Sequence, residues 1–172
     1  MKDVFSVRRS ENGDEVLKQL NNPIVTNVRT LSAATENLED YESGTTCLMS
    51  VATAMTVTLP KVQKGLQFTF VWTAIPTADS HIINADSTAD TLLGGVAMID
   101  EDTTVVATNA GATCAFAHPN LADHQVVIDA STTGTTKGGE IGSWLRYTGV
   151  SDTQWLLEGV LLINGTVATP FT

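Results

Sequence analysis

The stretch "GGEIGSWLRYTGVSDTQWLLEGVLL", residues 138–162, carries the clearest fold signal in the chain. Two apolar runs, each with a tryptophan, lie on either side of the short polar segment "TGVSDT". Short apolar runs that flank a turn rich in Gly, Ser and Asp are typical of a β-hairpin. The stretch holds no obvious catalytic group, so it forms either the wall of a site or the frame of a protein that sits on something else.

The same texture extends through most of the chain before this hairpin. In "MTVTLP", residues 55–60, apolar side chains alternate with threonines, and in "LQFTFVW", residues 66–72, they alternate with Gln67 and Thr69. A period of two places successive side chains on opposite faces of a strand. Further short runs follow, separated by Gly, Asn, Asp and Pro: "HIIN", "LLGGVAMID", "TTVVAT", "TCAFAH" and "HQVVIDA".

Many short strands of this kind predict an all-β fold, and we expect an antiparallel β-sandwich or barrel of jelly-roll-like form. No helical periodicity of useful length follows residue 40, and no internal repeat is evident. With 172 residues, the chain is long enough for one domain with a substantial core and an additional arm.

The first thirty residues differ from the rest. The segment "SENGDEVLKQLNN", residues 10–22, predicts a short helix that is capped by Ser10 or Asn12 and ends before Pro23. A helix this short is marginal in water unless it docks on a neighbour. We therefore expect an N-terminal arm over residues 1–29, carrying this helix, and a sandwich or barrel body over residues 30–172.

The charge of the chain is strongly acidic and unevenly distributed. The formal net charge is −10, yet residues 1–29 hold five Lys/Arg against four Asp/Glu. The excess of acidic groups therefore lies in the body, which should repel phosphate backbones, so we expect no nucleic-acid partner. No apolar run approaches the ~18 residues of a membrane span, and no apolar segment of a secretory signal follows the N-terminus, so we expect no membrane partner.

The candidate metal ligands do not form a convincing site. His118, Asp123 and His124 lie close together in "AHPNLADHQ", but Pro119 interrupts the segment and the last two side chains diverge in an extended chain. We expect a solvated loop there, and no metal or cofactor. Cys47 and Cys114 lie in apolar, strand-like runs, which favours two buried free thiols, although the sequence leaves their pairing open.

No catalytic motif appears either. The chain has no G-x-S-x-G elbow and no Gly-rich loop in the strand-to-helix setting that phosphate binding requires, so we expect no enzyme. Paired carboxylates of a glycosidase stay open, because spatial pairs are invisible in a sequence. The aromatic residues are compatible with a sugar-binding platform, but their places in alternating strands favour burial in a core or a subunit interface.

Several motifs in order along the chain carry a resemblance to a known family. They are "LSAATENLEDYESGTTCLMS", "VTLP", "GLQFTFVW", "HIINADS", "LLGGVAMID" and "GSWLRYTGVSDTQWLLEGVLLINGTV". In this order they resemble the head decoration, or cement, proteins of tailed bacteriophages. The resemblance covers residues 30–166 and leaves out the arm.

The resemblance implies a place on the outer surface of the virion capsid. Proteins of this family bind the expanded head, often as trimers, and clamp neighbouring major capsid proteins against the pressure of packaged DNA. The major capsid protein and further copies of the chain are therefore the expected partners. The alternative is a tail-fibre, collar or spike subunit that binds host surface glycans, and an enzyme such as a glycan hydrolase is least favoured.

Two sets of candidate functional residues follow from this reading. The first would contact the capsid from the arm: Val4, Phe5, Val7, Arg8 and Arg9. The second would anchor the core or the trimer interface: Phe68, Phe70, Trp72, Trp144, Trp155 and Leu157.

Overall fold

A computed structural model describes residues 5–9, 15–19, 27–76, 80–100, 114–129, 135–164 and 166–172. The fold is nearly all β, as the alternating sequence runs predict. Within these ranges the single helical element is the 3-10 turn η1 (Asp40–Glu42).

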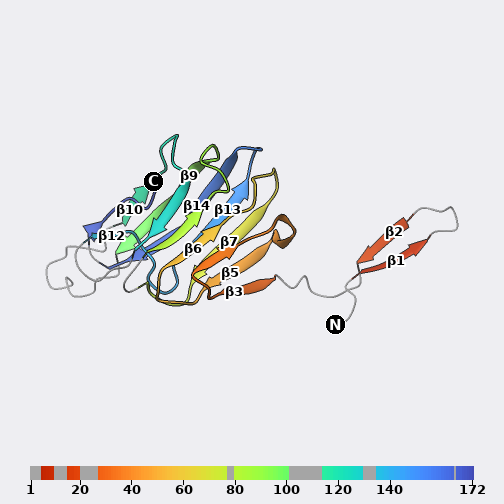
Figure 1. Ribbon diagram of the computed structural model, residues 1–172, viewed down its shortest axis with the longest axis horizontal. Coiled ribbons are helices and arrows are strands. Elements are labelled where there is room, and N and C mark those ends of the chain that lie inside the picture. Colours follow the sequence, from red (N-terminus) through yellow and green to blue (C-terminus); the bar gives the residue numbers. More distant parts are fainter. Residues whose placement is uncertain are drawn as a thin grey trace.

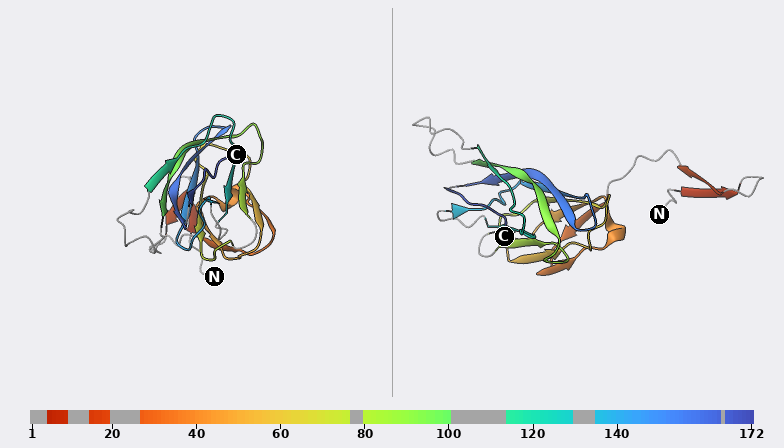
Figure 2. Two further views of the ribbon diagram at one scale, coloured as in Figure 1. Left: turned by 90° about the vertical axis from the view of Figure 1, so that its left-hand side faces the viewer. Right: turned by 90° about the horizontal axis from the view of Figure 1, so that it is seen from above.

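Two sheets build the body, and they lie as two layers (Figures 1 and 2). The larger sheet has seven strands, in the order β10 (Cys114–Ala117), β9 (Thr91–Asp100), β14 (Gln154–Ile163), β13 (Trp144–Gly149), β7 (Gln67–Trp72), β5 (Thr45–Met49) and β3 (Val28–Leu31). The smaller sheet has four strands, in the order β11 (Gln125–Ile128), β8 (His81–Asn84), β6 (Met55–Thr58) and β4 (Thr35–Asn37). A short parallel pair, β12 (Thr135–Thr136) with β15 (Thr166–Val167), accompanies them.

The first six strands of the body alternate between the two sheets. β3, β5 and β7 are parallel neighbours in the large sheet, while β4, β6 and β8 are parallel neighbours in the small one. The chain thus coils through three stacked turns of two strands each. Thr46 comes 18 residues after its partner Val28, and Thr69 comes 23 residues after Thr46. Because the turns differ in length, the coil leaves no fixed repeat in the sequence.

The expectation of antiparallel, jelly-roll-like sheets is therefore corrected, because both sheets are mixed. A strand that returns after crossing to the other sheet runs in the same direction as its predecessor, whereas a hairpin reverses the chain. Side-chain alternation does not report that direction. The hairpin predicted from residues 138–162 is confirmed: β13 and β14 are antiparallel, with Gly149 opposite Trp155.

One hydrophobic core lies between the two sheets and includes side chains of both. The large sheet contributes an aromatic cluster in which Tyr147 contacts Phe70 and Trp155 edge to face, with ring centroids 5.6 Å and 6.3 Å apart. Phe68 packs on Trp155 in the same manner at 6.2 Å. The small sheet faces this cluster with the inward residues of its strands: Met55, Val57, Ile83, Val126 and Ile128.

The helix expected over residues 10–22 is not found in the described part of that range, Glu15–Gln19, which is a strand. The described residues of the arm form two antiparallel strands, β1 (Phe5–Arg9) and β2 (Glu15–Gln19), which lie apart from the body in Figures 1 and 2. A helix this short has a costly nucleus and gains no packing when it does not dock, so a few helix-favouring residues do not decide the local structure. The proposed caps, Ser10 and Asn12, and also Val4 lie outside the described residues. The body begins with β3, inside the range assigned to the arm.

Candidate interaction surfaces

Five of the six predicted anchors lie in the core. Phe68, Phe70, Trp72, Trp155 and Leu157 are fully buried within the chain and point toward the small sheet. They therefore stabilise the body and cannot reach another protein. Trp144 differs from them, because it occupies an outward position of β13 and is half-buried.

Trp144 belongs to the outer face of the seven-stranded sheet. Strand register places it opposite Val71 on one side and Val160 on the other. The same row continues to both edges of the sheet. At the β10 edge it ends with Phe116, whose side chain is 83% exposed. The complete row across the seven strands is Thr30, Leu48, Val71, Trp144, Val160, Ala97 and Phe116.

More apolar side chains flank this row. Leu162, Ile99 and Cys114 form the next row toward one end of the strands, and Leu156 lies opposite Leu93 toward the other end. Leu162, Ile99 and Cys114 continue the apolar surface of the row through Trp144, whereas the row that contains Arg146 and Glu158 lies between this surface and Leu156. We call this surface the outer face: the outward residues of β3, β5, β7, β13, β14, β9 and β10.

The charge of the outer face contrasts with that of the chain. On these seven strands, the charged outward residues are Arg146 and Glu158 alone, which are direct neighbours on β13 and β14. Arg146 donates from Nε to Oε1 of Glu158 at 2.6 Å. The two charges cancel, so the face is neutral on a chain whose net charge is −10. A neutral apolar surface of this extent is typical of a protein–protein contact.

The outer face of the small sheet carries a polar row instead. One row across its four strands consists of Asn37, Thr58, Asn84 and Gln125. The row borders two adjoining hollows of about 500 Å³ and 330 Å³, which share Thr58 and Asp86. Oδ1 of Asn84 is buried and accepts no hydrogen bond from the described residues. Such amide and hydroxyl groups can recognise a neutral polar ligand, although no Phe, Tyr or Trp is among the described residues that line the hollows.

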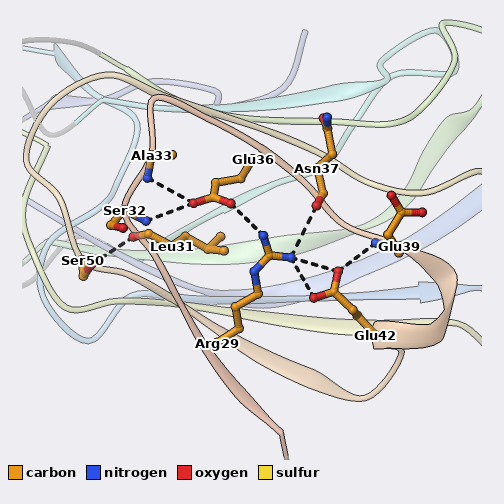
Figure 3. A network of polar contacts seen from close by, with 9 residues as sticks. All are labelled: Arg29, Leu31, Ser32, Ala33, Glu36, Asn37, Glu39, Glu42 and Ser50. Carbon is orange, nitrogen blue, oxygen red and sulfur yellow. Dashed lines mark hydrogen bonds and ion pairs between the residues drawn. The ribbon is translucent and has the colours of Figure 1, made fainter.

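An ion-pair network joins the first elements of the body (Figure 3). Arg29 on β3 donates to both carboxylate oxygens of Glu42 on η1, at 2.7 Å and 2.9 Å, and to Glu36 on β4 at 2.7 Å. Glu36 also accepts the backbone N–H groups of Ser32 and Ala33, at 3.2 Å and 3.1 Å. The network therefore fixes the point at which the arm leaves the body.

The pKa values of this network reflect mutual stabilisation. Burial acts to lower the pKa of Arg29, but the hydrogen bonds and charges of Glu42 and Glu36 outweigh it and raise the pKa. Burial acts to raise the pKa of Glu36, but the backbone donors and the Arg29 charge lower it. Both groups are held in their charged forms, so their ion pair holds β3 against β4.

The two cysteines occupy different environments, and both are free. Cys47 is buried in the core, and burial raises the pKa of its thiol to about 12. Cys114 is exposed and lies on the outer face, so the expectation of two buried thiols is wrong for Cys114. One thiol points into the core and the other lies at the edge of the outer face.

The predicted loop residues form local contacts. Asp123 accepts the backbone N–H of Asn120 at 2.7 Å, and thus closes a turn, while His118 and His124 lie beside nearby backbone carbonyls. No group of three or more His, Cys, Asp or Glu within the part of the chain that the structure describes is placed to hold a metal ion.

The chain matches no protein-family model and no curated protein. Among the described helical residues, no segment combines the length and apolarity that a membrane crossing requires.

Residues of the outer face other than Trp144 were not identified from the sequence. The sequence signal for this face is the run "LLEGVLL", residues 156–162, in which apolar residues lie on both faces of one strand. Such a strand is covered on both faces in a globular domain or in an assembly.

Proposed function

We propose that this protein is a capsid decoration protein of a tailed bacteriophage. It would bind the outer surface of the expanded head as a trimer and clamp neighbouring major capsid proteins. The observation that carries the proposal is the outer face, a neutral apolar surface on an otherwise acidic β body, which suits a protein whose work is assembly. The order of motifs along residues 30–166 supports the same reading.

The proposed mechanism is mechanical. The buried aromatic cluster makes the body a rigid β-sandwich, and the Arg29 network secures the base of the arm. The arm, with Phe5, Val7, Arg8 and Arg9 on β1, would then reach a neighbouring capsomer and bind there. Each weak contact is strengthened when three copies bind one shell together. A chain of net charge −10 suits the outside of a DNA-filled shell, and neither nucleic acid nor membrane is among the proposed partners.

Cosedimentation with DNA-filled, undecorated heads of the virus that encodes the chain tests this function. We expect saturable binding, with added density on the outer capsid surface in electron cryomicroscopy. Absence of saturable binding would refute decoration.

A truncated chain tests the role of the arm in the same experiment. The deletion should cover residues 1–26, because the Asn27 carbonyl accepts the N–H of Thr46 and Arg29 belongs to the network. We expect the truncated chain to keep its fold and oligomeric state and to bind heads weakly. Binding equal to that of the full chain would exclude the arm as a contact.

The polar row of the small sheet favours a second candidate, a tail-fibre, collar or spike subunit that binds host glycans. The unpartnered Oδ1 of Asn84 is a suitable acceptor for a sugar hydroxyl. A glycan array would then give binding that Asn84→Ala removes and that Thr56→Ala, one row away on the same face, retains. Absence of glycan binding by the full chain would dismiss this candidate.

A further inference from the structure

We propose that the outer face of the seven-stranded sheet is the contact between copies of this chain. It is thus a second copy, rather than the capsid protein, that covers Trp144, Val160 and their neighbours. This inference rests on the proposed function, in which the protein binds the head as an oligomer, and it names the surface through which the copies would meet. Of the six residues expected to anchor the core or the trimer interface, Trp144 lies on this face, and the other five are buried in the core.

Charge favours a second copy as the occupant. Two chains of net charge −10 repel each other wherever their acidic surfaces approach. On the outer face this repulsion is minimal, because Arg146 and Glu158 neutralise each other and no other charged residue has an outward position on the seven strands. A partner of opposite charge would gain more by binding the acidic surfaces. The neutral face is therefore the surface that suits a copy of the same acidic chain.

The extent of the face limits the size of a contact between copies. Its seven strands, spaced by about 4.8 Å, give a width of about 29 Å, and residues 156–162 of β14 span about 20 Å along the strand. The outline of the sheet is then at most about 600 Å², below the ~800 Å² that each partner buries in a standard interface.

The distribution of side chains fits as well. Trp144 lies in the middle of the sheet, with Val71 and Val160 as its cross-strand neighbours. Interfaces concentrate their binding energy in such central aromatic anchors, with smaller apolar contacts around them that exclude water. Phe116 at one edge is 83% exposed and extends the contact to β10. Trp144 thus has the place of a central anchor, and the smaller apolar residues surround it.

Sedimentation velocity of the full-length protein over a concentration series tests the proposal. We expect the wild-type chain to sediment as an oligomer, and Val160→Asp to weaken association at least about tenfold, because it places an unpaired carboxylate in the contact. The matched control is Val127→Asp, an equally half-buried, outward valine on the small sheet, which should associate like the wild type. A monomeric wild-type chain, or a Val160→Asp oligomer as tight as wild type, would overturn the proposal.

A second variant covers the case in which Val160→Asp does not fold, as judged by circular dichroism. Phe116→Asp changes a side chain that is already 83% exposed, so it should leave the fold intact and still weaken association. If a folded Phe116→Asp variant associates as tightly as the wild type, the outer face is not the contact between copies.

Head cosedimentation of the same proteins separates this proposal from the proposed function. If the wild type associates through the outer face but never binds heads, decoration fails and the contact between copies stands. If the wild type and Val160→Asp bind heads equally and have the same oligomeric state, decoration stands and the contact between copies is wrong.

Discussion

The indole N–H of Trp72 donates to Nδ1 of His81 at 3.1 Å, across the core from the large sheet to the small one. Both residues are fully buried. An indole nitrogen can only donate, so Nδ1 must accept, and the imidazole proton must lie on Nε2. Nε2 lies 3.0 Å from the carbonyl oxygen of Thr53 and donates to it. A neutral imidazole thus holds the two layers together, and a protonated one would lose the bond from Trp72.

The first prediction is a loss of stability at mildly acidic pH. Burial lowers the pKa of His81, and although the carbonyls of Thr53 and Val51 act to raise it, the pKa stays below its ordinary value. The unfolded chain therefore binds a proton more readily, and the free energy of unfolding should decline as the pH falls below about 6.5. Urea denaturation between pH 7 and pH 5 measures this. His81→Asn, whose amide oxygen can still accept from Trp72, should show a flatter dependence, and an equal slope would contradict the prediction.

The second prediction concerns the Arg29 network. Arg29→Met keeps the aliphatic stem but leaves Glu36 and Glu42 without their shared cation, and we expect it to cost about 1–2 kcal/mol. The control is Arg146→Met, which breaks the single pair with Glu158, whose side chains are 42% and 46% exposed. Exposed pairs contribute under ~1 kcal/mol, so this change should cost less. Chemical denaturation of both variants compares them, and equal costs would show that the network adds nothing to a surface pair.

The third prediction is that Tyr147→Phe does not destabilise the protein. Tyr147 is fully buried in the aromatic cluster, and its hydroxyl finds no hydrogen-bond partner among the described residues. Burial also raises the pKa of this hydroxyl well above its ordinary value. Removing an unpaired buried polar group relieves a desolvation cost of about 1–3 kcal/mol, while the ring contacts remain. We expect a higher melting temperature for Tyr147→Phe and no change for Tyr41→Phe, whose ring is 81% exposed. A clear loss of stability in Tyr147→Phe would mean that the hydroxyl is satisfied in solution.

The sequence predicted the strands better than it predicted their arrangement. Alternation in "LQFTFVW" correctly separated Phe68, Phe70 and Trp72 from their polar neighbours, because burial on one face of a strand leaves a period of two. The parallel coil of β3 to β8 could not be read, since alternation contains no information about the direction of the neighbouring strand. The helix expected near Val16 and Leu17 is a strand in the described residues, because so few apolar residues are not enough to establish a helical period.

The surfaces were harder to predict than the core. Trp144 and Trp155 look equivalent in the sequence, one on each side of the same turn, yet the register of β13 and β14 turns one outward and the other inward. Their assignment depends on a single residue of register, which reverses the face of every side chain in a strand. The polar row through Asn84 joins four strands that are far apart in the sequence, so no local motif marks it.

The last prediction uses the two thiols to report on the core and on the outer face at once. Iodoacetamide at pH 8 should alkylate the folded monomer once, at Cys114, because Cys47 is buried and its thiol pKa is raised to about 12. In 6 M guanidinium both thiols become accessible, and mass spectrometry should find two additions. Cys114 lies beside Ile99 on the outer face, so its alkylation in the wild-type oligomer should be slower than in Val160→Asp and should slow further as protein concentration rises. Alkylation of Cys47 in the folded chain would contradict the burial of β5, and a Cys114 rate independent of both the variant and the concentration would place Cys114 outside the contact between copies.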